Sequence, residues 1–199
     1  MTVITDYASL QVRVKEMLNR TDLNAHVDSF IQMACEDIDA DVDHPRMNDG
    51  LVFMADSEVG VPIDYRRTIE MNQVGIGEVY YYPMNEFDDL CARTQGGRIY
   101  TIIGDNFQFA PQLLGAQIRL TYRRDVAALS DFNPTNWILA AHPGAYLYGA
   151  LKHSALYLIE DDRLPLWNDM YQGAIDRINA KGVAWSTPQN TRLLKRKVV

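Results

Sequence analysis

The sequence lacks the short motifs by which many enzymes and metal proteins are recognised. It has no phosphate-binding loop, no GxGxxG after a predicted strand, no nucleophile elbow and no HExxH. Its four histidines include no pair at the i, i+4 spacing that ligates a metal on one helix face. They are His26, His44, His142 and His153. We therefore predict no catalytic residues, no metal site and no cofactor.

Cysteine and uninterrupted apolar runs are also scarce. Cys35 and Cys91 stand alone without a CxxC, which excludes a disulfide framework or zinc site and favours a reducing, intracellular origin. The N-terminus has no basic region followed by an apolar one. The longest apolar stretch is interrupted by Lys152 and His153. We expect neither a signal peptide nor a membrane-spanning helix.

Acidic residues crowd the segment EDIDADVDH. Asp37, Asp39, Asp41 and Asp43 alternate as calcium ligands do, but Val42 stands where an EF-hand loop counted from Asp37 needs glycine. The segment lies at the C-terminal end of a predicted helix, where the helix dipole is negative. Each acid there destabilises the helix by about 0.3–1 kcal/mol unless a positive group neutralises it. We predict that a basic surface neutralises these acids. Asp39, Asp41 and Asp43 are therefore candidates for a subunit interface.

Charge is unevenly distributed along the chain. The net charge is −7, yet the last seventeen residues hold four basic residues and no acid. We predict an extended basic arm over 183–199. It is either a solubilising tail or a segment that docks on a partner. The large apolar residues in it favour docking. The predicted contacts to a partner protein or a neighbouring subunit are Trp185, Arg192, Leu193, Leu194, Lys195, Arg196 and Lys197.

Hydrophobic periodicity predicts an α+β fold. Apolar residues recur at helical spacing over 5–19 and 23–42. Short runs rich in Val, Ile, Tyr and Phe predict four to six antiparallel strands in 50–125, with a hairpin at GDN. Helices are then predicted at 137–141, at 143–159 and up to Gly182. The expected organisation is a four-helix bundle built from 1–48 and 129–182, a β insertion at 49–128 and the arm at 183–199.

The helix predicted at 143–159 is apolar around most of its circumference. Its clearly polar positions are Lys152, His153 and Ser154, which cover a narrow sector. Such a helix is buried on more than one side, either by the core alone or by the core and a second copy. Small residues would allow close approach of a neighbouring backbone. The interface candidates here are Gly144, Tyr146 and Gly149.

Several stretches, in this order, resemble the head-to-tail adaptor (connector) proteins of tailed bacteriophages. The resemblance covers about residues 5–182 and is densest over 131–178. It rests on packing motifs rather than catalytic ones. The stretches are VPIDYRRTIEM, YTIIGDNFQFAP, IRLTYRRDVAALSD, NPTNWIL and PGAYLYGALKHSALYLIEDDRLPLWNDMYQGAI.

The resemblance implies a structural virion protein at the head–tail junction, made in the host cytoplasm. It would form a ring, typically of twelve copies, that binds the portal and the tail or nozzle protein. Double-stranded DNA would pass through without sequence-specific binding, and the Arg pairs at 66–67 and 123–124 are too few for such binding. The alternative is a tail-completion or tail-tube protein that contacts tail components alone. A hydrolase using Asp161 and Asp162 is disfavoured, because adjacent carboxylates do not face each other across a substrate.

Overall fold

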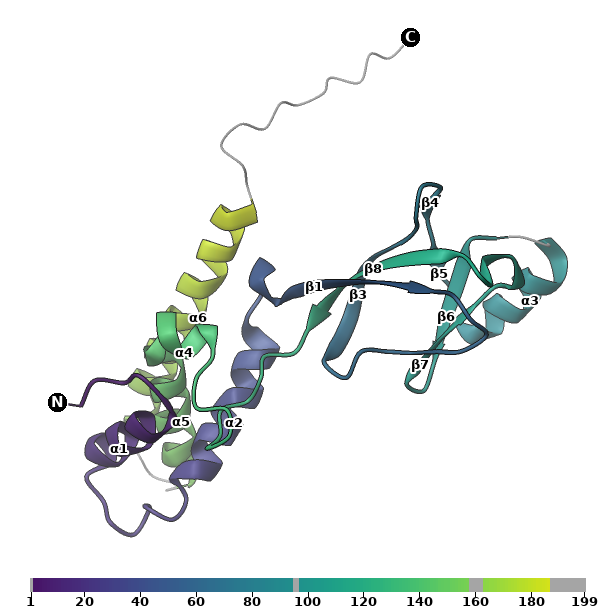
Figure 1. The fold of residues 1–199 in the computed structure, drawn as a ribbon. Helices are drawn as coiled ribbons and strands as arrows, with labels where there is room; N and C mark the ends of the chain where they lie inside the picture. Colours follow the sequence, from purple (N-terminus) through teal and green to yellow (C-terminus); the bar gives the residue numbers. More distant parts are fainter. Residues whose placement is uncertain (1, 95–96, 158–162, 187–199) are drawn as a thin grey trace. The chain divides into compact units, whose positions relative to one another are not determined.

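The computed structural model describes residues 2–94, 97–157 and 163–186. The chain divides into two compact units (Figure 1). A helical unit comprises the chain up to Arg46 and from Val126 onward, and a β unit comprises Met47–Asp125. Each unit has its own buried side chains, and each is described separately below.

Three helices of the helical unit begin at a capping side chain or at proline. The Asp6 side chain accepts a hydrogen bond from Ser9 N at the start of the first helix, and Asn136 caps the third. Pro143 begins the next helix, which confirms the predicted break between 137–141 and the helix from 143. The helices are α1 (Tyr7–Leu18), α2 (Val27–Asp41), α4 (Trp137–Ala141), α5 (Pro143–Tyr157) and α6 (Leu164–Ser186).

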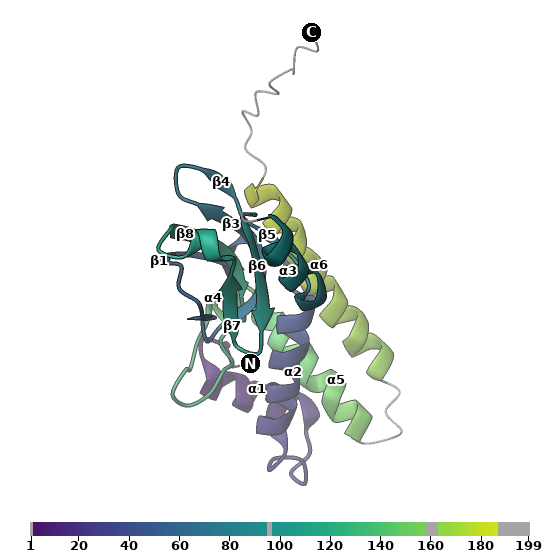
Figure 2. The ribbon, with the colours of Figure 1, turned by 90° about the vertical axis from the view of Figure 1, so that its right-hand side faces the viewer.

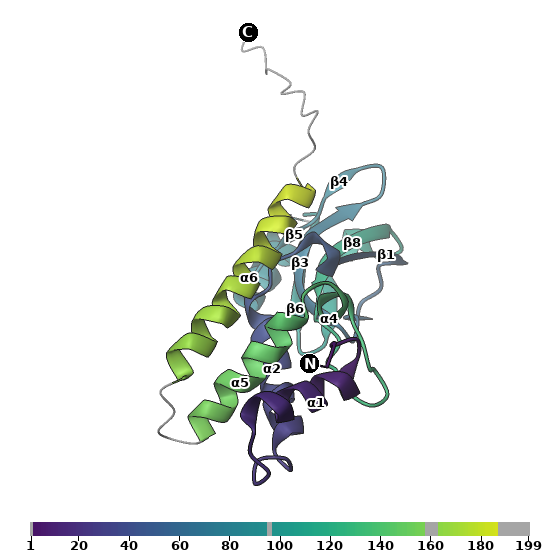
Figure 3. The ribbon, with the colours of Figure 1, turned by 90° about the vertical axis from the view of Figure 1, so that its left-hand side faces the viewer.

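Helix α5 lies at the centre of this unit. It contacts α1, α2, α4 and α6, and Figure 3 shows it between α6 and α1. Gly149 permits the close approach of α2, because a Cβ atom placed there would lie 2.9 Å from Cβ of Ala34. Helices of the same subunit therefore cover α5 on several sides.

The predicted four-helix bundle is wrong. The described residues form six helices and two four-stranded sheets, and the helices of the helical unit gather around α5 instead of forming the corners of a bundle. A helix that is apolar on nearly all sides gains most from a central position. The predicted end at Gly182 is also wrong, because α6 continues to Ser186. Gly182 instead lets α6 pack closely on the chain after α2, since an added Cβ would lie 3.0 Å from Asp43 O.

The β unit contains two sheets. The first has the order β1-β8-β3-β4, and Leu51, Leu120 and Met71 are neighbours across its first three strands (Figure 1). Its strands are β1 (Asn48–Met54), β3 (Tyr65–Gln73), β4 (Gly77–Glu78) and β8 (Gln117–Arg124). The second has the order β2-β7-β6-β5, with β5 parallel to β6. Its strands are β2 (Val59–Gly60), β5 (Tyr80–Tyr81), β6 (Ile99–Ile103) and β7 (Asn106–Phe109).

The hairpin predicted at GDN is confirmed. β6 and β7 pair in antiparallel register with Ile103 opposite Asn106, and Gly104 turns the chain at a positive φ of 57°. The predicted four to six strands were too few, because three of the eight described strands have only two residues each. Strands this short leave little alternation in the sequence.

A helix inside the β unit was not predicted. Helix α3 (Met84–Thr94) packs beside β6 (Figure 2). Buried Phe87 of α3 and buried Ile99 of β6 belong to one small apolar cluster. Phe87, Leu90 and Cys91 follow the i, i+3, i+4 spacing of a helix face, which is the signal that could have identified it.

Candidate interaction site

A hollow of about 440 Å³ lies in the helical unit where α6 passes the start of α4. Its lining combines two tryptophans with four basic side chains, and none of its residues is acidic. We call it the tryptophan pocket. Its lining residues are His44, Arg46, Trp137, Ala141, His142, Lys181, Ala184 and Trp185.

Arg46 contacts both aromatic walls of the tryptophan pocket. Its guanidinium carbon lies 5.1 Å from the ring centre of Trp185 and 5.7 Å from that of Trp137. Both distances fall within the range of cation–π attraction. The ring of buried His44 lies 4.9 Å from that of Trp137. The chain leaving α2, the first turn of α4 and the last turn of α6 therefore meet through these side chains.

The tryptophan pocket is electropositive. Lys181 Nζ lies 3.5 Å from His142 Nε2. Burial lowers the pKa of His142, and the nearby positive charges of Lys181 and Arg177 lower it further. Trp185 remains 65% exposed. A pocket with cationic groups and an exposed indole suits an aromatic side chain with a neighbouring carboxylate.

Two of the clustered acids of α2, Asp37 and Asp41, have partners inside the helical unit. Lys152 Nζ lies 2.6 Å and His153 Nε2 2.8 Å from the same Asp37 oxygen. Burial opposes ionisation of Asp37, but hydrogen bonds from these two side chains outweigh it and lower the pKa of the carboxyl group. Tyr171 Oη donates to Asp41 at 2.9 Å, and burial with this carboxylate raises the pKa of Tyr171.

Asp39 and Asp43 are also bound within the unit. Asp39 accepts a hydrogen bond from Val126 N at 2.6 Å, and Asp43 N donates to Asn179 Oδ1 at 2.7 Å. The Asp39 contact involves its carboxylate, whereas the Asp43 contact involves its backbone N–H. The assignment of Asp39, Asp41 and Asp43 to a subunit interface stays a prediction.

The interface candidates on α5 occupy different environments. Tyr146 is fully buried, and its hydroxyl accepts a hydrogen bond from Asn136 Nδ2 at 2.6 Å. Gly149 is buried against Ala34 and Tyr171, whereas Gly144 is half-buried beside Tyr148. Their predicted place between subunits is not tested by these contacts and stays a prediction.

Most residues of the predicted arm fall outside the part of the chain that the structure describes. These are Arg192, Leu193, Leu194, Lys195, Arg196 and Lys197. Trp185 is described, but it belongs to α6 and not to an extended segment. Sequence reasoning missed Arg46, Trp137 and Lys181 as its neighbours. The i, i+4 spacing of Lys181 and Trp185 places them on one helix face, but the packing of that face is visible only in the structure.

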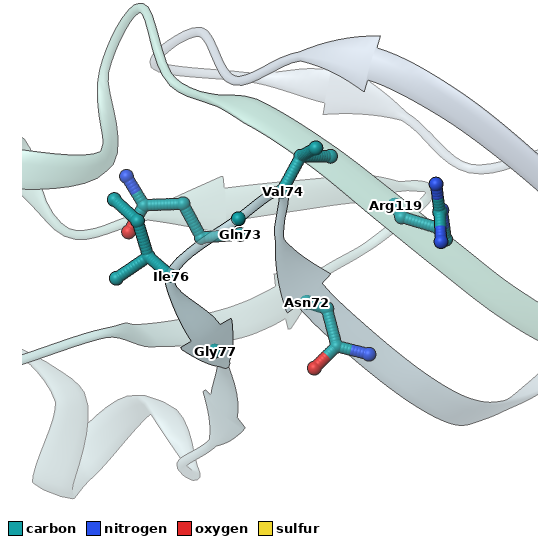
Figure 4. Close-up of a pocket in the computed structure, with 7 residues that line it drawn as sticks. Asn72, Gln73, Val74, Ile76, Gly77 and Arg119 are labelled. Atoms are coloured by element: carbon teal, nitrogen blue, oxygen red, sulfur yellow. The ribbon is translucent and has the colours of Figure 1, made fainter.

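A second hollow lies at the turn between β3 and β4 of the β unit. Figure 4 shows Gln73 and Ile76 together at the turn, with Asn72 and Arg119 on the strands away from them. Arg119 is the one charged group in its lining, which also includes Val74, Gly75 and Gly77. This lining holds amides and aliphatic groups and offers no acid–base pair for catalysis.

Over the described residues, histidine, cysteine and acidic side chains do not gather in threes that could hold an ion. None of the described helices combines the length and apolar character needed to cross a membrane.

Among curated proteins, no sequence matches this chain. The sequence profile of the SU10 adaptor protein family matches residues 5–192. This range includes all the described elements of both units and the tryptophan pocket. The match agrees with the resemblance to phage head-to-tail adaptors found in the sequence. The chain therefore belongs to the SU10 adaptor protein family.

Proposed function

We propose that this protein is a structural subunit of a phage head–tail junction, with no catalytic role. Copies assemble as a ring, typically of twelve, that joins the portal to the tail or nozzle. The subunits are made in the host cytoplasm and act in the virion. The observation that carries the proposal is the family match over residues 5–192.

Exposed apolar side chains of the helical unit support an assembly role. Helix α6 buries Trp167 and Tyr171 but exposes Leu166 and Met170 one turn apart. Trp185 adds an exposed indole near the end of the same helix. A cyclic ring requires two different patches on each subunit, one for each neighbour. Uncovered apolar groups of this kind suit such patches.

The basic C-terminal residues are proposed to bind the portal, with the adjacent adaptor as the second choice. Exposed ion pairs contribute about 0–1 kcal/mol each, so Leu193 and Leu194 would supply most of the affinity. The four basic residues would mainly steer the encounter. This division follows from composition: the last seventeen residues contain no acid and retain large apolar side chains.

DNA passage through the ring fits the charge of the rest of the chain. All 26 acidic residues precede residue 183, so this part carries a larger negative charge than the −7 of the whole protein. Acidic or neutral walls let DNA move, because a basic channel would bind phosphates and retard it. We propose passage of double-stranded DNA without sequence-specific contacts.

The direct test mixes the purified protein with the portal from the same phage. Native mass spectrometry is expected to show a mostly monomeric adaptor alone and a portal carrying a full ring after mixing. If the protein does not bind the portal but binds purified tail components, the tail-completion alternative is supported and the proposal is overturned. A stable free dimer that does not bind the portal would also count against it.

A further inference from the structure

The loop between β8 and α4 is held by hydrogen bonds along much of its length. Leu129 is fully buried and its carbonyl accepts a hydrogen bond from Gln32. Further bonds join the loop to itself and to α1. They are Asn133 Nδ2 to Ala128 O at 2.7 Å, Asn136 Nδ2 to Ala127 O at 3.0 Å and Tyr7 N to Pro134 O at 2.7 Å.

This fixed loop presents one aromatic side chain wholly to solvent. Phe132 is 101% exposed, and it lies inside the tight turn in which Ser130 and Asn133 exchange backbone hydrogen bonds. Exposed Asp131 precedes it. An aromatic group on a preordered loop loses little conformational freedom on binding, which makes it a favourable anchor.

The tryptophan pocket complements Asp131 and Phe132 in both chemistry and charge. The exposed indole of Trp185 offers an aromatic surface, and Arg46 and Lys181 offer positive charge. The lining contains no acid that would repel an incoming carboxylate. The basic C-terminal residues of the chain would be repelled by the same cations, so they are a poor occupant.

Resting on the proposed ring, we propose that Phe132 of one copy inserts into the tryptophan pocket of the next copy, where Asp131 faces Lys181. The two patches lie at different places on the helical unit. Leu129 of the loop is bound to Gln32, which lies roughly 14 Å along the helix axis before the end of α2, whereas His44 and Arg46 of the pocket follow that end. Two distinct patches make the contact head-to-tail, as ring closure requires.

The test uses the full chain on portal and reads the number of adaptors bound per portal by native mass spectrometry. Phe132→Ala should weaken association between adaptors by about tenfold or more, as removal of an aromatic interface anchor does. Val3→Ala removes an exposed apolar side chain of the same unit and serves as the matched control. Phe132 is fully exposed, so circular dichroism should show the variant folded.

A charge exchange tests the pairing. Asp131→Lys and Lys181→Asp should each reduce ring filling, and the double variant should restore it, because every copy then carries both exchanged groups. If Phe132→Ala forms complete rings on the portal as the wild type does, this inference is wrong and the proposed ring is unaffected. A double variant that assembles no better than the single ones would overturn the pairing as well.

Two other outcomes separate this inference from the proposed function. If Phe132→Ala abolishes portal binding while adaptors still associate with each other, the loop contacts the portal and the inference is wrong. If the wild-type chain forms no ring on portal under any condition tested, the proposed function itself fails.

Discussion

Lys152 on α5 and Asp37 on α2 form an ion pair with 2.6 Å between Nζ and Oδ2. The same carboxylate oxygen lies 2.8 Å from His153, and Lys152 Nζ also lies 4.3 Å from the ring centre of Tyr171 on α6. One lysine therefore contacts groups from two helices that pack on α5. Two of the three residues in the polar sector of α5, Lys152 and His153, thus have their partners in this network.

Asp37→Asn should lower the free energy of unfolding by about 1–2 kcal/mol, because Lys152 and His153 lose a charged partner in a half-buried site. The pKa of Asp37 is lowered in the folded state, so its stabilisation is present above the ordinary value of 3.8 and is lost as pH falls through the folded value. Urea unfolding at several pH values measures this. Glu36→Gln, at an exposed neighbouring acid, is the control. Equal stability of both variants would contradict the prediction.

Gly149→Ala should destabilise the protein by about 1–3 kcal/mol through overpacking, because the new Cβ would lie 2.9 Å from Ala34. Helix propensity alone would favour alanine by about 1 kcal/mol. Gly173→Ala is the matched control in α6, where the new Cβ would lie 3.6 Å from the end of the flexible Arg177 side chain. Thermal unfolding should show the control unchanged or more stable. A stabilised Gly149→Ala would show that α2 and α5 are further apart than described.

His142 should make the helical unit less stable in mild acid. Its pKa lies below the ordinary value of 6.5, so the unfolded chain binds the proton more tightly and stability falls as pH drops below 6.5. His142→Gln should reduce this loss between about pH 7 and pH 5. Lys181→Met should reduce it in part, whereas Lys15→Met, at an exposed lysine of α1, should not. Urea unfolding curves at each pH test the difference, and an unchanged pH slope in His142→Gln would refute it.

Removal of residues 187–199 should leave the body folded and weaken portal attachment by about tenfold or more, because Leu193 and Leu194 are lost. Replacing only the four basic residues by glutamine should have a smaller effect. That effect should be largest at low salt, because added salt screens the charges that steer the encounter. Binding titrations at two salt concentrations measure both variants. Unchanged attachment of the truncated chain would identify this segment as a solvating tail.

The elements of the helical unit were largely predictable because their signals are local. Asp6, Asn136 and Pro143 mark helix starts in this unit, and in the β unit GDN likewise marks a hairpin turn. The arrangement was not predictable in the same way. An apolar helix can lie in a bundle, at the centre of a cluster or between copies, and periodicity does not separate these cases. Gly182 looked like a helix end because glycine commonly ends helices, yet here it serves close packing.

The tryptophan pocket was hidden from sequence analysis for a related reason. Arg46, Trp137 and Trp185 are separated by long stretches of chain, and each one alone looks like an ordinary surface or core residue. Their proximity depends on how α6 packs against the end of α2. The family resemblance was accessible earlier because it depends on the order of many packing motifs, which is a property of the sequence itself.

Electron cryomicroscopy of the phage particle at the head–tail junction tests the central claim most directly. The proposed function predicts a closed ring of this chain between the portal and the tail or nozzle, with its C-terminal residues against the portal. A map that places the chain elsewhere in the tail, with a different protein bound beneath the portal, would contradict it.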